Sequence, residues 1–196
     1  LEQQGDQQAA LAHYRFCLAL DPSHVHALFR VGNMLVLMHD AEASLPYFRV
    51  LVALAPDYIP ARINFAIALK RLGQLLPAIE QLEHAAQVDA AALAVWQQLA
   101  DTHRLVGNAE AARDSYAKWA ALSPDDPKPA FMHQAMVSTL DPGADVPTRV
   151  PDALIRHLFD QAAPNFDNYA AQTIRYQVPG LFKRLISHFG FEGLSD

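Results

Sequence analysis

Three kinds of position recur along this chain at one fixed step of 34 residues, and this period constrains the fold more than any other feature. Helix-ending positions recur at Pro22, Pro56, Ala90 and Pro124. A small residue recurs at Ala10, Ser44, Ala78 and Ala112, and a large one follows it at Tyr14, Phe48, Leu82 and Tyr116. A period of this length with two helical segments per unit is typical of a solenoid of stacked helix pairs. The sequence therefore predicts an all-α fold.

Apolar periodicity and turn residues define the expected helices. They span 7–20, 24–38, 42–54, 58–71, 75–88, 93–106, 109–122, 128–140, 152–162 and 176–189. Residues 1–22 hold only the second helix of a unit, preceded by a turn at Gly5 and Asp6, and full units span 23–56, 57–90 and 91–124. Because a solenoid end exposes an apolar face, we expect the native chain to extend further toward the N-terminus.

Glycine is expected where the two helices of a unit meet. Gly73 and Gly107 suit turns that need a left-handed residue, whereas the second unit has His39 there, and its turn is predicted to be either locally strained or differently shaped. Gly32 lacks a side chain at the predicted crossing of its helix with the next one. A larger residue at this crossing is expected to overpack it.

The segments GDQQAALAHYRFCLALDP, VGNMLVLMHDAEASLPYFRVLVALAP, RLGQLLPAIEQLEHAAQVDA and VGNAEAARDSYAKWAALSP resemble tetratricopeptide repeats over residues 1–124. The chain departs from the repeat pattern at Ala66 and Ala100 in place of glycine, at Ala90 in place of proline, and at His39. The resemblance implies a right-handed α-solenoid of helix-turn-helix repeats that binds a protein or peptide, followed here by a C-terminal helical extension.

After Pro124 the period ends and prolines become frequent. We predict a capping helix within 125–140, a linker over 141–150 and a helical extension over 151–196. The extension is similar to the stretch before the catalytic core in bacterial proteins that join these repeats to an S-adenosylmethionine-dependent methyltransferase. The residues that carry this likeness include Phe159, Asp160, Phe166, Asp167, Tyr176 and Pro179. The cofactor fingerprint itself is not in these 196 residues, so the likeness implies S-adenosylmethionine (SAM) only for a longer parent.

The first helices of the units are expected to line the concave side of the solenoid, which such proteins use for binding. By register the groove contains His26, Phe29, Asn33, Val36, Leu37, Ile63, Asn64, Ile67, Lys70, Arg71, Gln97, Asp101 and Arg104. This wall is partly apolar and partly basic, which suits an extended or helical peptide. The alternative is that another part of the same chain covers its apolar residues.

Some tetratricopeptide proteins clamp the C-terminal carboxylate of chaperones with two asparagines and several basic residues. This sequence matches only at Asn33 and Asn64, and Phe29, Ala94 and Gln98 stand where basic residues are needed. Chaperone binding is therefore not expected, and the two asparagines are interpreted as structural hydrogen-bonding groups.

Other reactive residues are given structural interpretations. Cys17 falls on a small-residue core position and is predicted to be buried and inert. His24 and His26 stand two apart at a helix start, where their side chains diverge, so no metal site is predicted. Asp160 and Asp167 are interpreted as capping or surface carboxylates rather than a catalytic pair.

Composition narrows the classes of partner. A net charge of −6 with no basic and aromatic cluster argues against nucleic acid, and no apolar run is long enough to predict a membrane span. A single cysteine fits a reducing, cytoplasmic location.

These observations predict a non-catalytic interaction scaffold, with self-association through the uncovered first repeat as one further mode of contact. The alternative is the substrate-recruiting arm of an S-adenosylmethionine-dependent methyltransferase. A glycosyltransferase parent is a weaker third candidate, since the extension argues against it. In each case we expect no catalytic activity from these residues alone.

Overall fold

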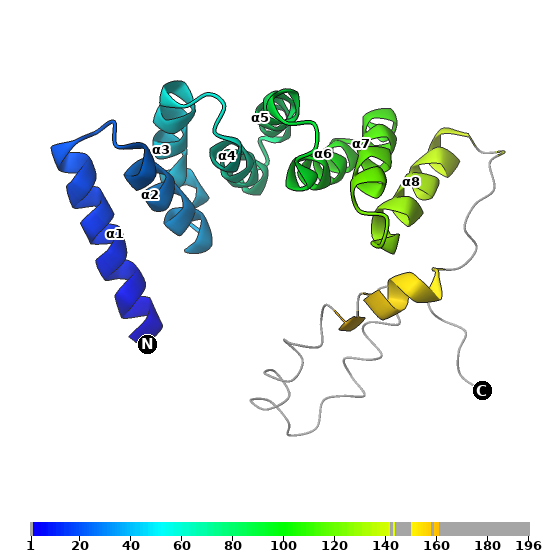
Figure 1. The fold of residues 1–196 in the computed structure, drawn as a ribbon, viewed down its shortest axis with the longest axis horizontal. Coiled ribbons are helices and arrows are strands. Elements are labelled where there is room, and N and C mark those ends of the chain that lie inside the picture. The colour runs from blue at the N-terminus through cyan, green and yellow to red at the C-terminus, as the bar shows by residue number, and fades with distance from the viewer. Residues whose placement is uncertain (1, 142, 144–149, 158, 161–196) are drawn as a thin grey trace, which may run out of the picture. The chain divides into compact units, whose positions relative to one another are not determined.

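The computed structural model describes residues 2–141, 143, 150–157, 159 and 160. Regular structure in these ranges is helical throughout (Figure 1). The labelled helices are α1 (Glu2–Leu20), α2 (Val25–Leu37), α3 (Ala41–Leu54), α4 (Ile59–Arg71), α5 (Leu75–Val88), α6 (Leu93–Val106), α7 (Ala109–Leu122) and α8 (Pro127–Leu140). Residues 152–157, 159 and 160 are also helical. The helix predicted over 176–189 lies outside the described residues.

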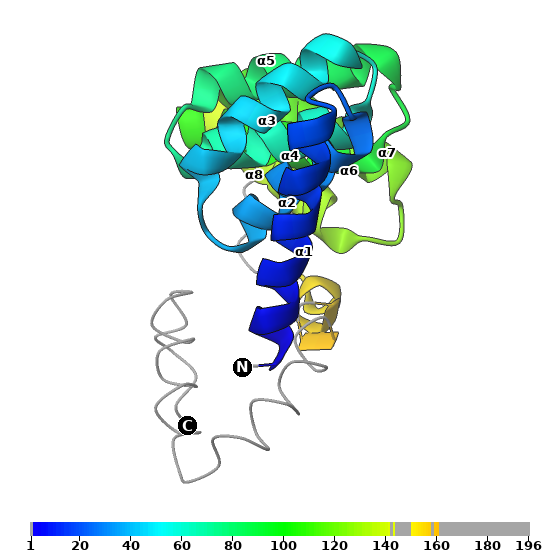
Figure 2. The ribbon, with the colours of Figure 1, turned by 90° about the vertical axis from the view of Figure 1, so that its left-hand side faces the viewer.

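The chain divides into two compact units, residues 1–150 and 151–196, and each is considered by itself. Within the first unit every helix packs on the next one along the chain, and α8 packs on α7. In addition α2 contacts α4 and α4 contacts α6, whereas α3, α5 and α7 do not contact one another. The helices therefore form two layers, and α2, α4 and α6 form the layer with the closer spacing (Figure 2). The predicted all-α stack of helix pairs is confirmed.

Capping side chains explain where several helices begin. His24 Nδ1 accepts a hydrogen bond from the amide of Ala27 at 3.2 Å, and Asp40 Oδ1 accepts one from Ala43 at 3.2 Å. Asn108 caps α7 in the same way as Asp40 caps α3. Such residues satisfy amide groups of the first turn that have no partner inside the helix. The predicted helices from α2 to α8 differ from the observed ones by at most one residue at either end.

The three turns inside the helix pairs share one backbone conformation. Gly73 and Gly107 have φ values of 74° and 82°, and His39 has a φ of 63°. Glycine adopts this left-handed region at little cost, whereas a side chain with a Cβ is strained in it. The predicted strain at His39 is confirmed, and it arises because the turn keeps the shape that glycine gives to the other two units.

Gly32 on α2 lies against the side chain of Phe48 on α3. A Cβ placed on Gly32 would lie 2.8 Å from Cζ of Phe48, whose side chain has no exposed surface. The predicted role of Gly32 at the helix crossing is confirmed. In the next two units the same positions hold Ala66 with Leu82 and Ala100 with Tyr116.

Two predictions for the first helix are wrong. Residues Gly5 and Asp6 lie inside α1, because the Glu and Gln residues around them favour a helix strongly enough to outweigh a glycine penalty of about 1 kcal/mol. Cys17 is exposed rather than buried. Its equivalents Leu51 and Ala85 are buried because α3 and α5 each pack between two neighbouring helices, whereas α1 contacts α2 alone.

We expect Gly32→Ala to lower the free energy of unfolding by about 1–3 kcal/mol, because the Phe48 ring has no space to move away. The double variant Gly32→Ala/Phe48→Leu is expected to regain part of this loss, since it reproduces the natural pair Ala66 and Leu82. Urea unfolding followed by circular dichroism measures both effects. Equal stability of Gly32→Ala and the parent would contradict the close contact.

We expect His39→Gly to raise the free energy of unfolding by about 0.5–1 kcal/mol, because glycine removes the strain of a positive φ. Gly73→Ala provides the reverse control. A Cβ on Gly73 meets no atom within 4 Å. The expected decrease of about 1 kcal/mol in the free energy of unfolding of Gly73→Ala therefore comes from the backbone conformation alone. Thermal unfolding of the two variants would show shifts of opposite sign, and shifts of the same sign would refute the shared turn conformation.

Candidate functional site

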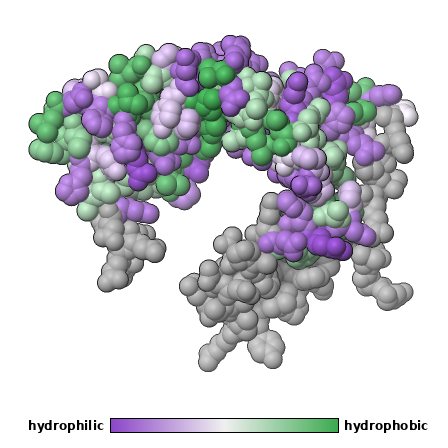
Figure 3. Space-filling model, viewed as in Figure 1, coloured by the Kyte–Doolittle hydropathy of each residue, from purple (hydrophilic) through white to green (hydrophobic). Residues whose placement is uncertain are grey.

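The candidate site is the inner surface, defined as the accessible side chains of α2, α4 and α6 that point away from α3, α5 and α7. The predicted groove residues that are half-buried on these helices are Phe29, Asn33, Ile63, Asn64, Ile67, Lys70, Gln97 and Asp101. Those that are exposed are His26, Leu37, Arg71 and Arg104. Apolar and polar residues are intermingled over the unit that holds these helices (Figure 3).

The prediction that Val36 lines the groove is wrong. Its side chain is only 4% exposed and belongs to the main hydrophobic core with Leu28 and Phe48. The Val36 side chain therefore faces the core instead of the groove, and its carbonyl also contacts another helix. That carbonyl accepts a hydrogen bond from Nη1 of Arg71 on α4.

The apolar part of the inner surface also joins α2 to α4. The Phe29 ring meets the Tyr58 ring edge-on, with 5.3 Å between ring centroids. Ile63 and Ile67 pack with one side against the main core. Because all three side chains are half-buried, each is held firmly on one side and accessible on the other.

Polar side chains bridge neighbouring helices of the inner layer. Asn64 Nδ2 on α4 donates to Asn33 Oδ1 on α2 at 3.3 Å, which confirms the structural role predicted for the two asparagines. Lys70 Nζ on α4 donates to Gln98 Oε1 on α6 at 2.6 Å. These bonds fix the rotamers of groups that would otherwise be mobile, and rigid groups lose less entropy on binding a partner.

Asp101 interacts with several polar side chains of the inner surface and its neighbourhood. The Tyr116 hydroxyl donates to Asp101 Oδ1 at 3.0 Å, and burial together with this carboxylate raises the pKa of Tyr116 to about 12. Burial lowers the pKa of Lys70, and the nearby Arg71 lowers it further while Asp101 opposes the shift. Lys70, Arg71, Asp101 and Tyr116 therefore form one electrostatic group.

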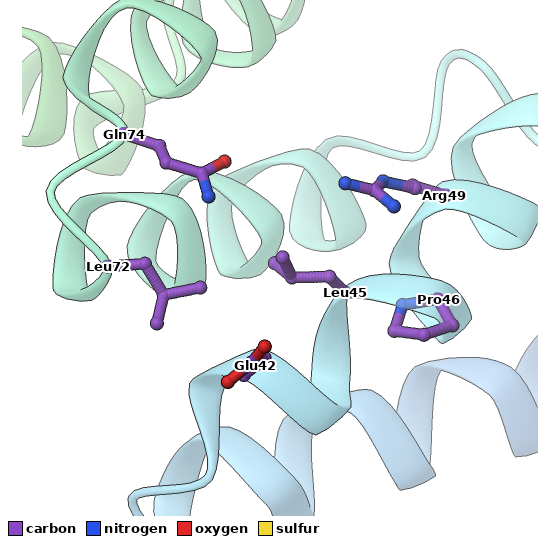
Figure 4. Close-up of a pocket in the computed structure, with 6 residues that line it drawn as sticks. All are labelled: Glu42, Leu45, Pro46, Arg49, Leu72 and Gln74. Carbon is purple, nitrogen blue, oxygen red and sulfur yellow. The ribbon is translucent and has the colours of Figure 1, made fainter.

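A separate pocket of about 510 Å³ lies outside the inner surface (Figure 4). Its lining residues are Glu42, Leu45, Pro46, Arg49, Leu72 and Gln74, from α3 and the turn between α4 and α5. The sequence analysis missed this pocket, because it forms between segments of two successive units. Its lining contains no Ser, Thr, Cys, Lys, His or Tyr. It combines three apolar side chains with one carboxylate, one guanidinium and one amide.

The remaining sequence-predicted residues contribute no reactive site in the described part of the chain. Within that part, no three His, Cys, Asp or Glu side chains stand close enough together to hold a metal ion. No described helix has the length and apolar character needed to cross a membrane. Phe159 and Asp160 are exposed. The other residues of the methyltransferase likeness, Phe166, Asp167, Tyr176 and Pro179, lie outside the described residues.

His103 is an unusual core residue that the sequence analysis did not single out. It occupies the register position of Leu35 and Leu69, and like them it is buried, with 8% of its surface exposed. Its Nδ1 has no hydrogen-bond partner, and burial lowers its pKa, with Glu83 opposing the shift. An unpartnered buried nitrogen of this kind costs stability.

Several solved structures are similar to this one, and two of them are described as TPR proteins. A crystal structure of MamA is 16% identical, with a TM-score of 0.67 over 87% of this chain and 94% of that chain. YrrB, described as a TPR protein with an unusual peptide-binding site, is 18% identical, with a TM-score of 0.63 over 72% of this chain and 73% of that chain. TTC0263, a thermophilic TPR protein in Thermus thermophilus, is 21% identical, with a TM-score of 0.60 over 87% of this chain and 92% of that chain.

Neither known protein families nor curated proteins give a match to this chain. At these identities the similar structures establish the fold alone, and that fold is the tetratricopeptide-repeat solenoid. The predicted resemblance over the repeats is therefore confirmed. The methyltransferase likeness of the extension receives no support from these structures.

We expect His103→Leu to raise the free energy of unfolding by about 1 kcal/mol near neutral pH, since it removes the unpartnered nitrogen. The folded-state pKa of His103 is lowered, so the unfolded chain takes up its proton first as the pH falls below about 6.5. The parent should therefore lose stability relative to the variant between about pH 7.5 and pH 5.5. Parallel urea titrations at several pH values test this, and superimposable pH profiles would exclude a buried neutral His103.

Proposed function

We propose that this chain is a non-catalytic interaction module whose inner surface binds an extended or helical peptide segment of a partner protein. The observation that carries the proposal is the half-buried state of Phe29, Ile63 and Ile67 on successive helices of one layer. Half-buried apolar side chains expose part of their surface to water, and a bound partner would cover that surface.

Preorganisation adds to this argument. The polar groups around the apolar residues are held by bonds between helices, such as Asn64 to Asn33 and Lys70 to Gln98. A partner that binds here orders few additional side chains, so more of the contact energy appears as affinity. Rigid backbone elements also position these groups better than loops would.

A similar fold that is described as having a peptide-binding site supports the same class of function. YrrB shares the solenoid with this chain at 18% identity. The similarity to YrrB is one of fold alone. The residues of this chain that would bind a peptide are inferred from the accessible side chains of its own inner surface. The methyltransferase-arm alternative has no supporting observation among the described residues or the compared proteins, and we do not propose it. A covering segment from the same chain remains the competing occupant, and it predicts that added peptides do not bind.

The test uses a phage-displayed library of random peptides about 12 residues long, selected on the 196-residue chain. Affinities of synthetic copies of the selected peptides are then measured by isothermal titration calorimetry. We expect Ile67→Glu and Leu37→Glu each to weaken binding about tenfold or more, because a carboxylate replaces apolar contact surface. Leu37 is 64% exposed, so its variant keeps the fold even if Ile67→Glu does not.

Val50→Glu is the matched control, since Val50 lies on α3 of the other layer and is 44% exposed. Its affinity for the peptides should equal that of the parent. Circular dichroism verifies that all three variants keep their helix content. If neither Ile67→Glu nor Leu37→Glu changes the affinity, or if no peptide is selected, the inner surface is not the binding site.

A further inference from the structure

Charge is distributed unequally between the two helix layers. The inner-layer helices α2, α4 and α6 carry five Lys or Arg residues and one acidic residue. These are Arg30, Arg62, Lys70, Arg71, Arg104 and Asp101. The helices α3, α5 and α7 carry more acidic than basic residues, namely Glu42, Glu80, Glu83, Glu110 and Asp114 against Arg49, Arg113 and Lys118. A positive inner layer is notable in a chain whose net charge is −6.

Two of the five inner-layer cations are engaged away from the inner surface. The guanidinium of Arg30 lies over a ring of α1. Arg62 is 7% exposed and donates to Gln81 on α5 at 2.7 Å. Both residues are explained by packing between helices.

The other three cations lie near the C-terminal ends of the adjacent helices α4 and α6. Lys70 on α4 reaches Gln98 on α6 and interacts with Asp101, and Arg104 interacts with Tyr116, whose hydroxyl donates to Asp101. Arg71 adjoins Lys70 and is exposed, as is Arg104. The cationic cluster, defined as Lys70, Arg71 and Arg104, thus spans two helices of the inner layer.

The cluster carries more positive charge than its surroundings neutralise. Asp101 is the acidic residue that interacts with Lys70 and with Tyr116, and the Tyr116 hydroxyl already occupies one of its oxygens. Arg71 donates to a neutral carbonyl, that of Val36. Three cations against one carboxylate leave a site that attracts negative charge.

Helix dipoles do not account for the cluster. A cation in the last turn stabilises a helix, and Lys70, Arg71 and Arg104 lie in the last turns of α4 and α6. However, the last turns of α1, α2, α3, α5, α7 and α8 contain no basic residue. Among the labelled helices, basic residues in the last turn therefore occur only in α4 and α6, which are adjacent in the inner layer. This distribution indicates a role at that place rather than a general stabilisation of helix ends.

We propose that the partner segment is acidic, with carboxylates that meet Lys70, Arg71 and Arg104 while an apolar side chain covers Ile63 and Ile67. This proposal rests on the peptide-binding function above and adds the chemical class of the peptide. Ile67 and Lys70 are three residues apart on α4, so apolar and charged contacts adjoin along one helix face. A long polyanion fits less well, because the negative net charge of the chain repels it beyond this short cluster.

The test compares three pools of fluorescein-labelled peptides about 12 residues long that share the same leucine positions. The remaining positions are drawn from Asp and Glu, from Asn and Gln, or from Lys and Arg. In fluorescence anisotropy we expect the acidic pool to bind about tenfold or more tighter than the amide pool, with the advantage lost as salt rises from ~50 mM to ~500 mM. Equal binding of the pools, or tighter binding of the basic pool, would overturn the proposal.

Charge-removing variants locate the effect. Arg71→Gln/Arg104→Gln should abolish the preference for the acidic pool, because it removes two exposed cations of the cluster. Since Arg71 also bonds to the Val36 carbonyl and Arg104 interacts with Tyr116, circular dichroism checks that the double variant keeps its helix content. The matched control Arg49→Gln/Arg113→Gln removes two charges from α3 and α7 and should leave the preference intact. An equal effect of both double variants would show general electrostatic attraction and would refute the site.

Two further outcomes distinguish failure of the acidic preference from failure of the peptide-binding function. If Leu37→Glu abolishes binding of every pool but the acidic pool has no advantage, the acidic preference is wrong and the peptide-binding function stands. If no pool binds and no library peptide is selected, both fail. A single-stranded DNA of about 12 nucleotides that binds as tightly as the acidic pool would also contradict a peptide-specific site.

Discussion

The contact between a small residue on one helix and a large residue on its partner determines the geometry of every unit. Phe48 fills the space that Gly32 leaves open, and the pairs Ala66 with Leu82 and Ala100 with Tyr116 occupy the same register. Phe48, Leu82 and Tyr116 are each at most 1% exposed. Because close-packed interiors tolerate little change in volume, this contact fixes how near the two helices of a pair come. Stacking of units with that fixed spacing then produces two layers, of which only the layer of α2, α4 and α6 is continuous.

The inner surface serves two purposes at once. Phe29, Asn33 and Lys70 join neighbouring helices and also present accessible surface. Stability and binding are therefore coupled, since the bonds that hold successive units together also hold the binding groups in place. A partner that bridges α2, α4 and α6 would stabilise the array, because ligands that bind the folded state shift the unfolding equilibrium. The inner-layer helices carry a net positive charge, although the net charge of the whole chain is negative.

The wrong predictions for Cys17 and Val36 share one cause, which is that register alone does not reveal the neighbours of a helix. Cys17 stands at the register position of buried Leu51, yet it is exposed because α1 packs on one helix instead of two. Register on α2 places Val36 in the groove, but its side chain turns toward the core. For His103 the repeat register did carry a signal, because it stands at the position of buried Leu35 and Leu69, whereas its local sequence alone does not distinguish a buried histidine from a surface one.

The sequence by itself determined the repeat period, the helix boundaries from α2 to α8 and the roles of Gly32 and His39, because these follow from local propensity and from a pattern repeated in several units. It also identified most residues of the inner surface, since helical periodicity determines which face a residue occupies. Only the tertiary structure decided which of those residues are bonded across helices. It also decided that Lys70 interacts with Asp101, that Arg104 interacts with Tyr116, and that Arg71 bonds to a carbonyl of α2. These relations join residues that lie on different helices and far apart in the sequence, and their distances depend on how closely successive helices pack, which no local pattern encodes.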